Sequence, residues 1–187
     1  MPLRLPGRPL LGLLVALWIG LTGLGVQPAA AALTNNTYDG NIYALYAGNG
    51  SLVPPRSSLA QAMADHRPAA VIFYLDDDAA SKQFSPVVSE LQRLWGNRIE
   101  LIPLVIDPLQ NRPTEGPSDP ATYWSGVIPQ VVVFDPDGKV VFNASGLVDV
   151  DRINDGLSKA TGIPLPEGGT TSTTVSFNEL NAEVVSR

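Results

Sequence analysis

Three consecutive carboxylates, Asp76, Asp77 and Asp78, are the residues of this chain whose type and spacing could most directly do chemistry. Neighbouring carboxyl groups act as acid and base where burial separates their pKa values, and oxygen-rich sites bind calcium or magnesium. A calcium loop, however, needs alternating ligands and more oxygens than this run supplies. Asp78 also precedes a predicted helix, where a carboxylate caps free amides and suits the helix dipole. We therefore favour capping for Asp78 and keep metal binding and catalysis as alternatives.

Residue types that many catalytic sites require are missing or nearly so. The chain has no cysteine, and the nucleophile of thiol redox chemistry is a thiolate. It therefore has no thiol–disulfide chemistry of its own and no disulfide. His66 is the only histidine, so a histidine-based metal site or catalytic triad lacks its parts. The favoured prediction is a chain without a catalytic residue, a bound metal or a cofactor.

An apolar strand and a long amphipathic helix flank the three aspartates. Residues 70–75 form a continuous apolar run, which is typical of a strand buried on both faces. Residues 79–95 repeat apolar side chains at three- and four-residue spacing, which predicts a helix with one face in the core. Pro86 lies inside this helix and should bend it. The carboxylates are therefore expected at a turn between a buried strand and the start of a helix.

Strands and helices alternate through the rest of the chain. Aromatic and branched residues at 41–47 predict a first strand, and a proline-rich passage occupies residues 108–120. The other predicted elements are a helix from Ser57 or Ser58 to residue 66, a strand at 100–107, a short helix at 119–125, a hairpin of 130–134 with 139–142, and a helix at 149–160.

The segment 73–86 resembles the active-site segment of thioredoxins, in which a strand and an aromatic turn lead to Cys-x-x-Cys-Lys and a proline-containing helix. Aligned without a gap, the two cysteine positions fall on Asp78 and Ser81, whereas Lys82 keeps the basic position. The buried aspartate that moves a proton in active thioredoxins corresponds to Ile72. The resemblance implies a thioredoxin fold whose active-site positions are degenerate.

A second motif supports the resemblance. Ile128 and Pro129 precede an apolar run, as the cis-proline of thioredoxins precedes the fourth strand. In that family the backbone beside this proline pairs with an extended protein segment, in the manner of strand addition. The resemblance therefore implies a binding edge at Val127, Ile128 and Pro129, with Tyr123 and Trp124 nearby. The alternative for Trp124 is that it covers the core.

Taken together, the two motifs imply an α/β fold of thioredoxin type, with three layers and a central mixed sheet, over residues 33–165. Before it, residues 1–32 combine Arg4 and Arg8 with an uncharged apolar run of about 17 residues and an alanine-rich end, which predicts a signal peptide. That length is the lower limit for spanning a bilayer, so a retained membrane anchor helix is the alternative. Residues 166–187 are expected to form a flexible linker and a short amphipathic segment.

The charge of the chain restricts its partners. Without residues 1–32 it has 10 basic and 18 acidic residues, a net charge of −8. Nucleic acids and anionic lipids require a positive surface, so we expect neither as a partner. We expect instead a protein or an extended peptide, and membrane association only through residues 1–32 if they are not cleaved.

The amino-acid sequence of residues 42–46 and 71–76 resembles that of cyanobacterial thylakoid thioredoxin-like proteins. That resemblance implies export to the periplasm or the thylakoid lumen, possible anchoring in the membrane, and a non-redox protein-binding role in the folding or assembly of a membrane complex such as a photosystem. The alternative is a thiol–disulfide oxidoreductase by descent that acts through an unusual site or through a partner's cysteines.

Overall fold

The computed structural model describes residues 33–165 of the 187-residue chain. The predicted signal or anchor segment, 1–32, and the predicted linker and amphipathic segment, 166–187, lie outside these residues. Among the helices of residues 33–165, none is long and apolar enough to cross a membrane.

A four-stranded mixed sheet forms the centre of the domain. Its strands are β1 (Ala69–Tyr74), β2 (Glu100–Val105), β3 (Gln130–Phe134) and β4 (Val140–Ser145), in the order β2-β1-β3-β4. β1 runs parallel to β2, whereas β3 is antiparallel to both β1 and β4. Every residue of β1, and every residue of β3, is buried, as expected for central strands covered on both faces.

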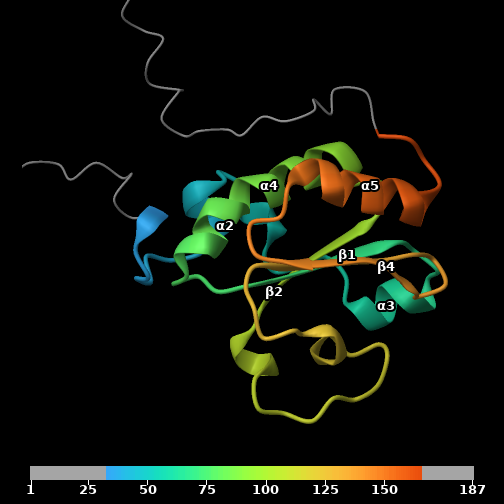
Figure 1. Ribbon diagram of the computed structural model, residues 1–187, viewed down its shortest axis with the longest axis horizontal. Helices are drawn as coiled ribbons and strands as arrows, with labels where there is room; N and C mark the ends of the chain where they lie inside the picture. Colours follow the sequence, from blue (N-terminus) through green and yellow to red (C-terminus); the bar gives the residue numbers. More distant parts are fainter. Residues whose placement is uncertain (1–32, 166–187) are drawn as a thin grey trace, which may run out of the picture. The chain divides into compact units, whose positions relative to one another are not determined.

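Helices cover both faces of this sheet (Figure 1). α2 (Ile42–Tyr46), α4 (Ala79–Trp95) and α5 (Val150–Thr161) pack on one face, and α3 (Leu59–Ala64) lies on the other. The result is the three-layer arrangement with a mixed sheet that the resemblance to thioredoxins implied.

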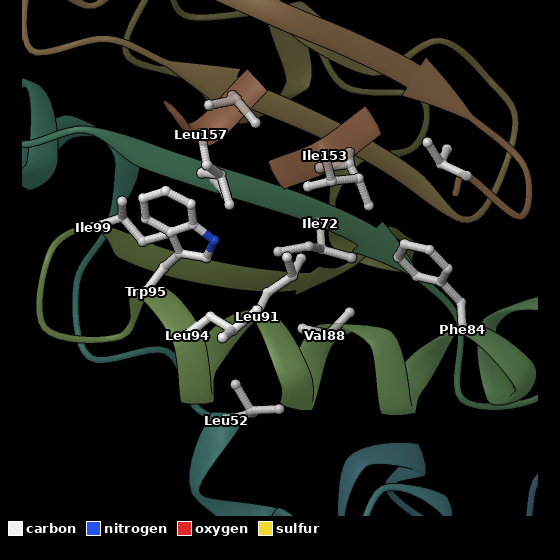
Figure 2. Packing of buried hydrophobic residues seen from close by; sticks show 14 of the residues in the cluster. Leu52, Ile72, Phe84, Val88, Leu91, Leu94, Trp95, Ile99, Ile153 and Leu157 are labelled. Atoms are coloured by element: carbon white, nitrogen blue, oxygen red, sulfur yellow. The ribbon is translucent and has the colours of Figure 1, made fainter. Parts of the chain in front are cut away.

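The alternation of side chains along β1 divides the core into two clusters. Ala70, Ile72 and Tyr74 belong to the cluster beneath α2, α4 and α5, whereas Val71 and Phe73 belong to the cluster that includes α3. Figure 2 shows the first cluster, in which apolar side chains of α4 point toward the strand that carries Ile72. The three- and four-residue spacing predicted for α4 is confirmed by this packing.

The predicted strand at residues 41–47 is wrong, because these residues contain the short helix α2. Ile42 and Tyr43 are buried side by side and the next two residues are exposed, a pattern that suits one helical turn and not a strand. Asn41 caps the helix by accepting from the Ala44 amide at 3.2 Å, and Asp76 accepts from the Ile42 amide at 3.0 Å. The local cap and the tertiary contact with Asp76 together outweigh the β-favouring composition of the segment.

The predicted helix at residues 119–125 is shorter than expected, a single 3₁₀ turn at Pro120–Tyr123. Asp119 caps it by accepting from the Ala121 amide at 3.1 Å. The same carboxylate accepts from the Arg112 guanidinium and from the Glu115 amide. These bonds order the proline-rich passage that connects β2 to β3.

Candidate functional site

Two of the three aspartates act on the starts of helices. Asp78 is the N-cap of α4, and its Oδ2 accepts from the Ser81 amide at 2.6 Å, which confirms the capping interpretation. Asp76 accepts from the first amide of α2, and Asp77 is exposed. Across residues 33–165, no group of three or more acidic or histidine side chains is placed to hold a metal ion.

Asp76 holds its proton more readily than an ordinary surface carboxyl group does, because its environment raises its pKa. Burial raises the pKa of Asp76, and the negative charges of Asp77 and Asp107 raise it further, against the opposing effect of the Ile42 amide. Asp77 and Asp107 therefore act on the protonation of Asp76 where β1 and β2 end.

Ser81, which the resemblance aligns with the second thioredoxin cysteine, has a structural role. Its side chain is 1% exposed, and its hydroxyl accepts from the Leu75 amide at 3.3 Å. That bond ties the residue after β1 to the first turn of α4. Ile72, at the position of the proton-relay aspartate, is fully buried among apolar side chains. The site therefore lacks both the thiols and the proton relay of an active thioredoxin.

Lys82 is fully buried at the start of α4. Its Nζ donates to the carbonyl of Thr37 at 2.6 Å and to Asp39 Oδ2 at 2.7 Å, and the Tyr46 hydroxyl donates to the same Asp39 oxygen at 2.8 Å. Burial opposes the charge on Lys82, but Asp39 and Tyr46 outweigh burial and raise the pKa of the lysine. The hydrogen bond from Lys82 is the main cause that lowers the pKa of Asp39.

Residues 33–39, which we call the strap, lie across the first turn of α4. Besides the bonds to Lys82, the Ala79 amide donates to Asn36 Oδ1 at 2.9 Å and the Gln83 side chain donates to the Leu33 carbonyl at 3.3 Å. The strap therefore contacts the same helical turn that holds the degenerate site. The strap could not be predicted from the sequence, because nothing near Lys82 marks a partner 43 residues earlier.

The predicted binding edge precedes β3. The Ile128–Pro129 peptide bond is cis, and the Pro129 carbonyl accepts from the Gly146 amide at 2.7 Å. Within residues 33–165, the main-chain N–H and C=O groups of Val127 and Ile128 have no hydrogen-bond partner. The Val127 side chain is 53% exposed. This short stretch therefore leaves main-chain groups unpaired where the chain enters β3.

The aromatic pair beside this edge belongs largely to the core. Tyr123 meets Phe134 edge-on at 4.8 Å between ring centroids, and Trp124 lies 5.5 Å from Phe73. Both side chains are partly buried against the cluster on the α3 side of the sheet, as is Ile128. The packing favours the core-covering role for Trp124.

Gln130 is a residue of this edge that the sequence analysis missed. It is fully buried, and its Oε1 accepts from both the amide and the hydroxyl of Ser125 at 2.9 and 3.0 Å. Its Nε2 donates to the Tyr123 carbonyl at 2.8 Å and to Asn143 Oδ1 at 2.9 Å. The amide side chain thus fixes the loop before Val127. A lone polar residue at the start of an apolar strand was the available signal.

A cleft of about 580 Å³ lies elsewhere, between residues 54–60 and the proline-rich passage, over Ile102 and Leu104 of β2. None of the predicted site residues lines it. The predicted binding edge is therefore separate from this cleft.

Comparison with known proteins assigns the chain to a family. It is 36% identical over 158 residues to thylakoid membrane protein slr1796 of Synechocystis sp. (strain ATCC 27184 / PCC 6803 / Kazusa). The alignment covers 84% of this chain and 78% of that protein. The chain belongs to the family of this thylakoid membrane protein. Because it has no cysteine, it is a family member without thiol chemistry. No family profile matches the chain.

Solved structures similar to the chain include thioredoxins. One is the exposed lipoprotein thioredoxin of Streptococcus pneumoniae strain TIGR4, with 17% identity, a TM-score of 0.42, and coverage of 52% of this chain and 89% of that one. Another is a mutant thioredoxin of Halobacterium salinarum NRC-1, with 23% identity, a TM-score of 0.43, and coverage of 55% and 82%.

Proposed function

We propose that this protein is a non-redox, thioredoxin-like binding protein of a thylakoid compartment, which holds extended protein segments and supports the folding or assembly of a membrane complex such as a photosystem. Three properties support the proposal: the absence of cysteine, the unpartnered main chain before β3, and the relative named as a thylakoid membrane protein.

The observation that carries the proposal is the free main chain of Val127 and Ile128. β3 pairs with β1 as far as Gln130, opposite Phe73, and with β4 as far as Ser145. Val127 and Ile128 lie outside the sheet, and their N–H and C=O groups are unpaired among residues 33–165. An extended segment that bonds to such groups gains affinity from its main chain and specificity from neighbouring side chains.

The thylakoid location in this proposal is extended to the chain from its Synechocystis relative. The name of the Synechocystis protein places that protein in the thylakoid membrane, and we extend this location to the present chain. Residues 1–32 would then direct export, as a cleaved signal or as a retained anchor. The binding edge would face the lumen or the periplasm.

Site-specific photo-crosslinking tests the proposal. A photoreactive amino acid replaces Val127 in the full-length chain expressed in cyanobacterial cells, and the adducts are identified by mass spectrometry. A matched probe replaces Leu45, which is 54% exposed on α2. We expect adducts with membrane proteins from position 127 and few from position 45. Equal yields from the two positions, or none from 127, would contradict binding at this edge.

A further inference from the structure

Two exposed apolar side chains flank the unpaired main chain at the binding edge. Val127 is 53% exposed and Leu147 is 60% exposed. Their loops are held together by the bond from the Gly146 amide to the Pro129 carbonyl at 2.7 Å and by the contact of the Ser125 and Ser145 hydroxyls at 3.0 Å. A strand that pairs with residues 127–128 therefore meets apolar surface on two adjacent loops.

The register of the sheet places carboxylates at the same end. Phe73 lies opposite Gln130 in the antiparallel pair of β1 and β3, so the end of β1 and the start of β3 lie at the same end of the sheet. The Ile106 amide donates to the Tyr74 carbonyl at 3.1 Å, which puts the residue after Ile106 near the end of β1. The four carboxylates at this end are Asp76, Asp77, Asp78 and Asp107.

No cation balances these four charges within residues 33–165. The ion pairs of that region involve other acids. Lys82, the basic residue nearest in sequence to the aspartates, is buried and bonded to Asp39. Asp77 and Asp107 are exposed, and the negative charge of each raises the pKa of Asp76. An incoming segment thus meets carboxylates that form no ion pair within residues 33–165.

We propose that the occupant of this edge is cationic: an extended protein segment in which lysine or arginine alternates with apolar residues. The inference rests on the binding role proposed above and specifies its partner. Neighbouring side chains of a strand point to opposite sides, so such a segment can place apolar groups on Val127 and Leu147 while its cations approach the aspartates. Complementary charge of this kind gives specificity and speeds association.

Binding of three synthetic peptides to the full-length chain in nonionic detergent tests the proposal. Each fluorescent peptide alternates valine with one other residue, which is lysine, glutamine or glutamate, and fluorescence anisotropy gives the Kd. We expect the lysine peptide to bind about fivefold more tightly than the glutamine peptide and the glutamate peptide to bind most weakly. The difference should shrink as salt is raised, because exposed charges are screened.

Matched variants of the protein test which residues cause the preference for the lysine peptide. Asp77→Asn combined with Asp107→Asn should remove most of the preference for lysine and leave binding of the glutamine peptide unchanged. The control, Asp137→Asn combined with Asp155→Asn, removes the same charge from two exposed acids away from the edge and should keep the preference. Val127→Ser combined with Leu147→Ser should weaken binding of all three peptides.

The outcomes separate this inference from the proposed function. If the three peptides bind with equal Kd values, and Val127→Ser combined with Leu147→Ser abolishes this binding, the cationic preference is overturned. Binding of extended segments at the edge would still be supported. A lysine preference that survives Asp77→Asn with Asp107→Asn would overturn the role of these aspartates. Failure of every peptide to bind would overturn both proposals.

Discussion

Lys82 shows at the residue scale how the domain uses a position that the thioredoxin pattern keeps basic. Its ammonium group is fully buried and bonds to a carboxylate and to carbonyl groups of the strap. A buried cation is costly unless it is paired and hydrogen-bonded. The strap therefore stabilises the charge, and the charge in turn holds the strap on α4.

The first prediction concerns pH. The pKa of Asp39 is lowered from 3.8, mainly by the hydrogen bond from Lys82. The ionised Asp39 side chain therefore contributes stability above pH 3.8, the ordinary pKa. This contribution is lost as the pH falls through the lower pKa of the folded state. Urea unfolding should therefore show Asp39→Asn less stable than the wild type at pH 7, with the difference shrinking below about pH 4. Asp137→Asn is the control, and a difference that stays constant with pH would contradict the linkage.

The second prediction concerns the degenerate site. Asp78 and Ser81 lie at the cap and in the first turn of α4, and the sequence resemblance aligns them with the thioredoxin cysteines. Asp78→Cys combined with Ser81→Cys should form an intramolecular disulfide under mild oxidant, detected by mass spectrometry, because the two side chains share one helical turn. Loss of the cap should cost about 1 kcal/mol. A variant that stays reduced, or that forms mainly dimers, would contradict the alignment.

The third prediction concerns a buried polar pair. Trp95 is fully buried and its Nε1 donates to Asn154 Oδ1 at 2.9 Å, which joins α4 to α5. Asn154→Ala leaves this donor unsatisfied and should lower the free energy of unfolding by about 1–3 kcal/mol. The exposed neighbour Asp155→Ala should change it by no more than about 0.5 kcal/mol. Equal effects of the two variants in urea unfolding would argue against the buried bond.

Close packing between elements requires one glycine in α5. A Cβ on Gly156 would come within 2.7 Å of the Phe142 Cβ on β4. The glycine therefore lets α5 approach the sheet closely, although glycine lowers the intrinsic stability of the helix.

The fourth prediction follows from this contact. Gly156→Ala should destabilise the domain by about 1–3 kcal/mol, because overpacking outweighs the gain of about 1 kcal/mol in helix propensity. In the background of Phe142→Gly, which also removes the Cβ that alanine would keep, the same change should become neutral or stabilising. Thermal or urea unfolding of the four members of this double-mutant cycle measures the coupling. Equal effects in both backgrounds would rule out the contact as the cause.

At the scale of the whole molecule, the chain has a thioredoxin-like architecture without the cysteines on which the thioredoxin reaction depends. The fifth prediction is that the purified full-length chain reduces or oxidises insulin no faster than buffer, since the chain has no thiol. Turnover that survives removal of contaminating thioredoxin and disappears on Asp78→Ala would instead support the oxidoreductase alternative.

The sequence by itself predicted the elements whose signals are local. The apolar run of β1 and the periodicity of α4 and α5 gave these elements close to their observed bounds, because burial on both faces or on one helical face leaves a pattern in neighbouring residues. The absence of cysteine excluded thiol chemistry by composition alone. Asp78 could be recognised as a cap because a cap and its helix are adjacent in sequence.

Only the tertiary structure decided the features that depend on residues far apart in the chain. Residues 41–47 contain a helix because Asp76 bonds to the Ile42 amide, and Lys82 is buried because Asp39 reaches it. The edge at Val127 gains Leu147 as a neighbour only through the pairing of two loops. Side-chain periodicity records which face of an element is buried, but it does not record what lies against that face. Non-local contacts of this kind therefore leave no pattern in the sequence around either partner.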